Sequence, residues 1–176
     1  ATADEQSFFH WELEYPEVFF GEDGEKLDKV GFDAVVSNPP YIRAENLRQT
    51  QNNLLEYLTT ESNYSTTEGR FDIYSPFVEQ GSRLAKNNSV CYILPNKFFE
   101  SGGGKPLRQY LTNNRLIKEI VDFEQYQVFQ DVTTYTCILS LESQRKEFDY
   151  IRTSNKETNI RNIHNFDDAT IDINDL

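Results

Sequence analysis

The chain has 176 residues, of which 38% are hydrophobic and 26% are charged, and its formal net charge is −12. This length and composition are those of one ordinary globular domain with a core of its own. No stretch approaches the run of about 20 apolar residues that a membrane-spanning helix needs, and the first residues, ATADEQS, are neither basic nor apolar. We therefore expect a cytoplasmic protein with no membrane partner.

The charge and the metal-binding residue types exclude some classes of site. The two cysteines and two histidines stand apart from one another, so they form no metal-ligand spacing and no disulfide framework, and we expect no metal. The negative charge argues against a nucleic-acid partner. Residues 85–120, however, contain six basic and two acidic residues, so that objection does not apply to every part of the chain.

The first third of the chain contains one strand pattern and two less regular segments. Residues 8–20, FFHWELEYPEVFF, are dense in aromatic residues and interrupted by Pro16, which favours a packed edge segment over a regular amphipathic helix. Residues 32–37, FDAVVS, form a short apolar run typical of a buried parallel strand. Residues 42–60 are polar but suit a helix.

The rest of the chain alternates helix and strand patterns. Residues 71–88 predict a helix, and residues 96–114 predict a loop that leads into another. The first of these helices would present one common face, formed by Ile73, Phe77, Gly81 and Leu84. Strands are predicted at 89–95, 116–124, 133–143 and 147–152, and residues 153–176 have no clear pattern. The order predicts an α/β fold with a mixed sheet and an antiparallel finish.

SNPPY, residues 37–41, follows the first predicted strand and contains two prolines that cannot donate backbone hydrogen bonds. Ligands bind where the strands of open α/β sheets end. Asn38 offers a side-chain carbonyl beside the free carbonyl of Pro39, and Tyr41 offers an aromatic face that can stack on a base pulled out of a duplex. Two converging acceptors suit a planar amino group and favour the pyramidal form, whose lone pair can attack. The motif indicates methyl transfer to an exocyclic amine by positioning and electrostatics.

Asn38–Tyr41 resembles the [D/N/S]PP[Y/F/W] motif of amino-methyltransferases that use S-adenosylmethionine, and the NPPY form is typical of adenine-N6 DNA methyltransferases. Blocks at residues 9–19, 31–42, 71–99 and 116–141 resemble, in the same order, restriction–modification methylases that often carry methylase and nuclease in one chain. One departure is LAKNNS at 84–89, where the family usually has LLKxGG. The resemblance covers about residues 8 to 141.

The resemblance implies a role for each matching residue. Asn38 and the Pro39 carbonyl would accept from the adenine amino group, and Pro40 would hold the turn. Tyr41 and Phe129 would stack on the two faces of the flipped base. Phe77, with Asn38, would contact the cofactor S-adenosylmethionine, and Lys97 would be a weaker candidate for a backbone phosphate. The DNA partner would be a duplex with one adenine turned out.

The resemblance also implies that parts of the enzyme lie outside this sequence. The family's glycine-rich cofactor loop precedes the NPPY block, and no such stretch precedes Asn38 here. We therefore expect residues 1–152 to be the second half of a Rossmann-like methyltransferase domain, and residues 153–176 to be a polar tail or the start of a linker to a target-recognition region. The isolated chain is expected to be inactive and to bind the cofactor weakly. A fused nuclease would be a further partner.

Two other interpretations remain open from the sequence. Other NPPY enzymes methylate a protein glutamine or ribosomal RNA, although the aromatic block upstream and the segment VFQDVTTYTCIL argue against these substrates. Methylation of the N4 atom of cytosine is chemically close, although Asn38 with Tyr41 favours adenine. In the non-catalytic interpretation, the chain is an α/β binding module and SNPPY is only a rigid turn.

Overall fold

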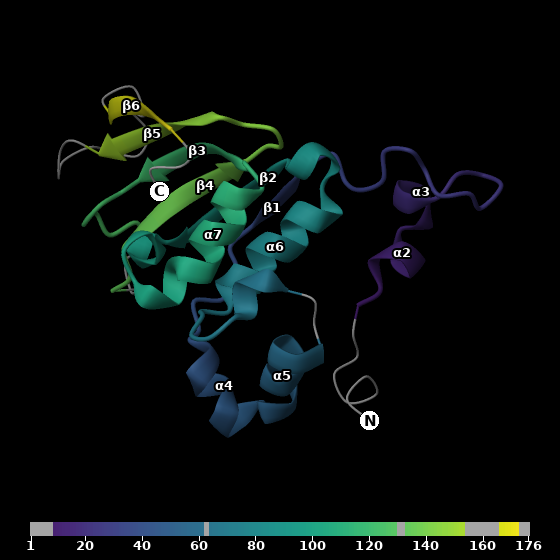
Figure 1. Ribbon diagram of the computed structural model, residues 1–176, viewed down its shortest axis with the longest axis horizontal. Helices are drawn as coiled ribbons and strands as arrows, with labels where there is room; N and C mark the ends of the chain where they lie inside the picture. The colour runs from purple at the N-terminus through teal and green to yellow at the C-terminus, as the bar shows by residue number, and fades with distance from the viewer. Residues whose placement is uncertain (1–8, 62–63, 130–132, 154–165, 173–176) are drawn as a thin grey trace.

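The computed structural model describes residues 9–61, 64–129, 133–153 and 166–172. In these residues the strands form one six-stranded mixed sheet with the order β1-β2-β4-β3-β5-β6 (Figure 1). The predicted α/β class is therefore confirmed. The strands are β1 (Val35–Ser37), β2 (Val90–Pro95), β3 (Ile117–Asp122), β4 (Thr136–Leu141), β5 (Glu147–Thr153) and β6 (Phe166–Asp172).

The sheet begins parallel and becomes largely antiparallel. β1 and β2 are parallel, whereas β4 is antiparallel to both of its neighbours, β2 and β3. β5 is parallel to β3, and β6 pairs with β5 in the antiparallel direction. The mixed sheet with an antiparallel finish is confirmed. β6 lies in the stretch where the sequence has no strand pattern; the domain boundaries at 152 and 153 stay a prediction.

Two helices, α6 (Tyr74–Leu84) and α7 (Lys105–Asn113), cover one face of the sheet (Figure 1). Both contain a proline in the first turn, where a missing backbone donor has little effect, as the sequence predicts. Val78, Leu94 and Leu107 are fully buried in the core between these helices and the sheet. The core therefore packs α6 against β2, which lies beside β1.

The common face predicted for residues 71–88 is wrong at one position, Phe77. The ring of Phe77 is 44% exposed, while the other three members of the predicted face are buried; these are Ile73, Gly81 and Leu84. Tyr74 and Val78 define the side of α6 that packs on the sheet. Phe77 precedes Val78 by one residue and so points about 100° away from it around the helix.

A second, smaller core lies beside the sheet, where the sequence predicts a helix over residues 42–60. The helical prediction is confirmed, but the segment is divided into α4 (Ala44–Thr50), α5 (Asn52–Glu56) and the π-helical turn η1 (Tyr57–Glu61). Leu47 and Phe71 are among the buried residues of this core. The helices are short, and their apolar side chains gather against the residues that precede α6.

The aromatic segment before β1 forms two helices of four residues, α2 (Trp11–Glu14) and α3 (Pro16–Phe19). The rings of Trp11 and Tyr15 lie 5.6 and 5.5 Å from the ring of Phe32, in edge-to-face contacts. Residues 9–17 are nevertheless exposed and Phe19 is buried, so the predicted packing of this aromatic segment is confirmed only near its end. No helix in the described ranges is long and apolar enough to cross a membrane.

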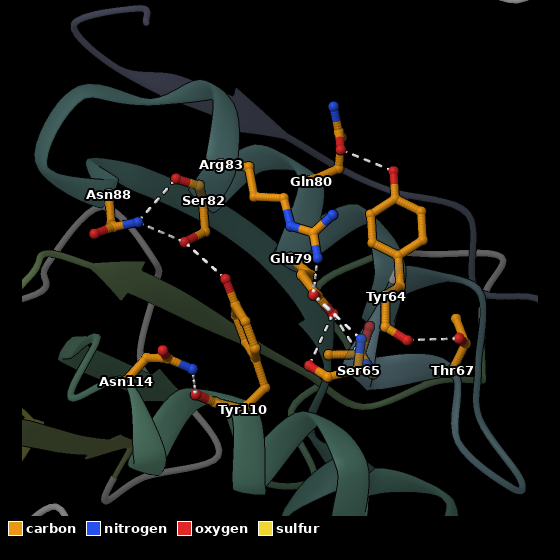
Figure 2. A network of polar contacts seen from close by, with 11 residues as sticks. Tyr64, Ser65, Thr67, Glu79, Gln80, Ser82, Arg83, Asn88, Tyr110 and Asn114 are labelled. Atoms are coloured by element: carbon orange, nitrogen blue, oxygen red, sulfur yellow. Dashed lines mark hydrogen bonds and ion pairs between the residues drawn. The ribbon is translucent and has the colours of Figure 1, made fainter. Parts of the chain in front are cut away.

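A buried polar network around Glu79 connects α6 to the turn before it (Figure 2). The carboxylate of Glu79 accepts hydrogen bonds from the backbone N–H groups of Ser65 and Thr66 at 3.2 and 2.9 Å, and it pairs with Arg83 at 2.5 Å. Glu79 is 1% exposed. This turn is η2 (Ser65–Thr67), and the described residues contain further 3-10 segments at η3 (Lys86–Asn88), η4 (Asn96–Phe99) and η5 (Gly102–Gly104).

Candidate functional site

The topology brings several chain segments to one edge of the sheet. β1 and β2 are parallel, so SNPPY and η4 leave the sheet at the same edge. β4 begins at this edge, because Thr136 pairs with Pro95, and β3 ends there, because Asp122 pairs with Cys137. Crevices at such strand ends are the usual ligand sites of α/β sheets.

Within SNPPY the side chains alternate between solvent and core. Asn38 and Pro40 are exposed, Pro39 is buried and Tyr41 is half-buried. Among the described residues, the side-chain amide of Asn38 has no hydrogen-bond partner. A buried proline on one side and an exposed amide on the other fix the backbone while leaving an acceptor open to a ligand.

Tyr41 is attached to the neighbouring strand by its hydroxyl group, which donates a hydrogen bond of 3.1 Å to the backbone carbonyl of Ile93 in β2. Burial, and to a lesser extent the nearby Cys137 thiol, raises the pKa of Tyr41 to about 12. The hydroxyl is therefore neutral at physiological pH, and its donated bond holds the ring beside the strand ends.

The chain just after Tyr41 is also held in place. The N–H of Ala44 donates to the carbonyl of Phe71 at 3.1 Å, and the N–H of Ile73 donates to that of Ile42 at 2.8 Å. These bonds make an antiparallel bridge around Arg43 and Asp72. SNPPY is thus fixed by β1 on one side and by the bridge on the other.

The remaining predicted site residues come from two other elements. Phe129 is half-buried in the connection between β3 and β4. β3 ends and β4 begins at the edge of the sheet where the site lies. Residues 130–132 of this connection are outside the described part. Phe77 lies on α6, which packs against β1 and β2. Its ring is exposed and therefore available for contact with a ligand or another protein segment.

Sequence reasoning missed a polar cluster at the same edge. The amide of Asn96 donates to the carboxylate of Asp122 at 2.9 Å, and the hydroxyl of Tyr150 donates to the same carboxylate at 2.7 Å. Burial, followed by this hydrogen bond, raises the pKa of Tyr150 to about 12. The cluster lines a cavity of about 780 Å³ that also includes Tyr135. Asn96 directly follows a predicted strand, which is the signal that could have identified it.

The glycines of the ESGGGK segment form the ordered 3-10 turn η5 that leads into α7. A Cβ atom on Gly104 would lie 2.2 Å from the carbonyl oxygen of Phe98, so only glycine fits at this position. This close backbone approach explains why a glycine occupies position 104.

The pKa of Tyr41 leads to a prediction for alkaline pH. We expect its phenolate to form near pH 12 and not near the ordinary value of about 10. Because folding raises this pKa, the stability that the neutral hydroxyl contributes is complete below about pH 10 and is lost as the pH rises towards 12. The measurement is the near-ultraviolet phenolate absorbance of the wild type minus that of Tyr41→Phe. A difference step centred near pH 10 would contradict the prediction.

Comparisons with known proteins identify relatives of the chain. The model of a family described as Eco57I restriction-modification methylase matches residues 1–129. The type II restriction enzyme and methyltransferase RM.Eco57I of Escherichia coli is 33% identical over 122 residues, which are 69% of this chain and 12% of that protein. The type II methyltransferase M.BstVI of Geobacillus stearothermophilus is 28% identical over 144 residues, which are 81% of this chain and 24% of that protein. The chain thus spans less than a quarter of the length of either relative.

Solved structures share the fold at low sequence identity. The type IIG restriction endonuclease BpuSI superposes with a TM-score of 0.57 at 15% identity, covering 81% of this chain and 19% of that chain. This similarity supports the predicted Rossmann-like methyltransferase fold.

Proposed function

Because the chain belongs to the Eco57I restriction-modification methylase family, we propose that it supplies the catalytic motif of a DNA methyltransferase that modifies the N6 amino group of adenine. The observation that carries the proposal is the open amide of Asn38 at the carboxyl end of β1, beside the fixed ring of Tyr41. The chain spans a small part of its relatives, so we expect the whole activity to require other parts of the protein.

The proposed reaction depends on the hydrogen bonds that SNPPY accepts from the amino group of the substrate. The side-chain carbonyl of Asn38 and the backbone carbonyl of Pro39 would accept the two hydrogens of the adenine amino group. This polarises the nitrogen, so that its lone pair can form the new N–C bond while the methyl–sulfur bond of the donor breaks and its electron pair stays on sulfur, and one proton is subsequently lost to solvent. Pro40 would keep both acceptors in register, since its ring fixes a backbone angle. The backbone that carries both acceptors is fixed before the substrate arrives, and preorganised polar groups lower a barrier in this way.

The target base would be held by stacking. Tyr41 would cover one face of an adenine turned out of the duplex, and Phe129 would cover the other. Both side chains are half-buried at the same edge of the sheet, which supports this pairing. Base–aromatic stacking contributes about 1–3 kcal/mol per base, comparable with the cost of unstacking the nucleotide.

S-adenosylmethionine is the proposed methyl donor, and it supplies an electrophilic methyl group on sulfur. The exposed ring of Phe77 and the open amide of Asn38 fit contacts with such a molecule, because one is apolar and accessible and the other is polar and accessible. We expect the main glycine-rich cofactor loop and a target-recognition region to lie in other parts of the protein, which would act in the cytoplasm.

Product analysis tests the proposal. The protein that carries this chain is incubated with labelled S-adenosylmethionine and DNA, and the nucleosides are then separated and identified by mass spectrometry. We expect N6-methyladenine. N4-methylcytosine would show that the methylated amine belongs to cytosine and not to adenine. Label in RNA or protein with none in DNA would overturn the proposal.

A further inference from the structure

A cavity of about 280 Å³ lies next to the segment that follows SNPPY. Three basic side chains line it, and each comes from a different part of the chain: Arg43 follows SNPPY, Arg70 precedes α6 and Lys97 follows β2. Two acidic residues, Glu45 and Asp72, line the same cavity. The positive charge here is unusual in a chain whose net charge is −12.

Arg43 has a fixed position relative to the candidate catalytic motif. Its backbone belongs to the bridge with Asp72, and it comes two residues after Tyr41. Two residues span at most about 7 Å of chain. Arg43 therefore lies close in the chain to the residue proposed to stack on the target base.

Lys97 is oriented by a buried carboxylate. Its ammonium group lies 3.0 Å from a carboxylate oxygen of Asp72, which also accepts a hydrogen bond of 3.1 Å from the Tyr74 hydroxyl. Asp72 is 7% exposed, whereas the Lys97 side chain is 43% exposed. An ammonium group has three donors, so this ion pair leaves donors of Lys97 available towards the cavity.

The charges of the cavity do not cancel. Asp72 is balanced by Lys97, and Glu45 is balanced by Arg70 in a pair of 3.5 Å whose two side chains are 61% and 87% exposed. Such an exposed pair is weak and can exchange partners. Among the described residues, Arg43 has no ion pair. The cavity therefore suits an anion with one charge and several acceptor oxygens, because guanidinium groups bind such oxygens in a bidentate manner.

We propose that this cavity binds a backbone phosphate of the DNA strand that carries the target base, with Arg43 as the main contact and Lys97 as the second. The proposal rests on the proposed function, because it assumes that the substrate bound at the catalytic site is DNA. A phosphate contact of this kind sets the register of the strand and carries no sequence information.

The test measures DNA binding and does not depend on methyl transfer. Binding of the protein that carries this chain to a duplex of about 20 base pairs is followed by fluorescence anisotropy over a series of salt concentrations, and the slope of log affinity against log salt counts phosphate contacts at about 0.9 for each contact in B-form DNA. We expect Arg43→Gln to reduce the slope by about one. Lys118→Gln is the matched control, because Lys118 is half-exposed at the start of β3, on the opposite edge of the sheet. We expect the control to keep the wild-type slope.

A second measurement locates the contact. The duplex contains one adenine opposite an abasic site, which favours extrusion of that base, and the phosphates beside it are replaced one at a time by neutral methylphosphonates. At one of these linkages, we expect the wild type to lose affinity and Arg43→Gln to lose none.

The outcomes separate this proposal from the proposed function. Equal slopes for Arg43→Gln and Lys118→Gln, no dependence on any neutral linkage, or no binding by the wild type at low salt would overturn the phosphate site. A methylated base other than N6-methyladenine would overturn the proposed function and leave the slope result standing. Unchanged thermal unfolding of Arg43→Gln is expected, since its side chain is exposed.

Discussion

Replacing Asn38 with alanine is expected to lower methyl transfer to DNA by about a hundredfold or more, the scale measured when one preorganised polar group is removed from an active site. The variant loses the proposed side-chain acceptor for the amino group and keeps the two prolines that fix the turn. Asn38 is exposed, and among the described residues its amide has no partner, so the melting temperature should not fall. The measurement is incorporation of labelled methyl groups by the protein that carries this chain.

Two controls make this result specific to the acceptor. Asn38→Asp retains an oxygen acceptor and should recover part of the lost activity. Asn113→Ala removes the same type of side chain from the exposed end of α7 and should leave methyl transfer unchanged. If Asn38→Ala retained activity within a few-fold of the wild type, Asn38 would not be catalytic.

Replacing Glu79 with alanine is expected to lower the free energy of unfolding by about 1–3 kcal/mol, the cost of leaving buried hydrogen-bond donors without an acceptor. The change removes the acceptor of the Ser65 and Thr66 N–H groups and the ion pair with Arg83 (Figure 2). Buried donors that lose their partner carry the full cost of desolvation. Chemical denaturation followed by circular dichroism measures the change.

The control for Glu79 is a carboxylate outside the network. Glu56→Ala removes an exposed glutamate from α5, so the free energy of unfolding should change by less than about 0.5 kcal/mol. Glu79→Gln keeps the volume and one acceptor oxygen, and we expect an intermediate loss. A change below about 1 kcal/mol for Glu79→Ala would show that the turn at Ser65–Thr67 is held by other contacts.

Glu79 and Asn38 differ in burial, which fits a structural role for Glu79 and a ligand-binding role for Asn38. Glu79 lies in the interior, where an ordered carboxylate can fix a turn and keep the small helical region beside the sheet attached to α6. Asn38 lies at an open strand end, where an acceptor without a partner costs little because water satisfies it. A ligand that replaces this water meets an acceptor whose backbone is already fixed by β1, Tyr41 and the Arg43–Asp72 bridge.

Local sequence patterns were sufficient to predict those strands and helices whose formation depends on a single segment of the chain. The strands with continuous apolar runs, such as residues 90–95, and the helix that contains Pro106 near its start were predicted from the sequence, because period and proline chemistry act over a few residues. The motif at residues 37–41 was also identified from its letters alone. Patterns were weaker at β6, whose strand forms against β5, a pairing that no local pattern contains.

By itself, the sequence determined the α/β class, the family resemblance and the residue types of the candidate site, since these follow from short-range spacing and from motif chemistry. Only the tertiary structure decided that Phe77 faces outward, that Tyr41 donates to β2, and that Arg43, Asp72 and Lys97 meet at one cavity. Arg43 and Lys97 are 54 positions apart in the sequence. Their approach depends on the parallel pairing of β1 and β2 and on the bridge to Asp72, which are long-range contacts set by the packing of the whole sheet.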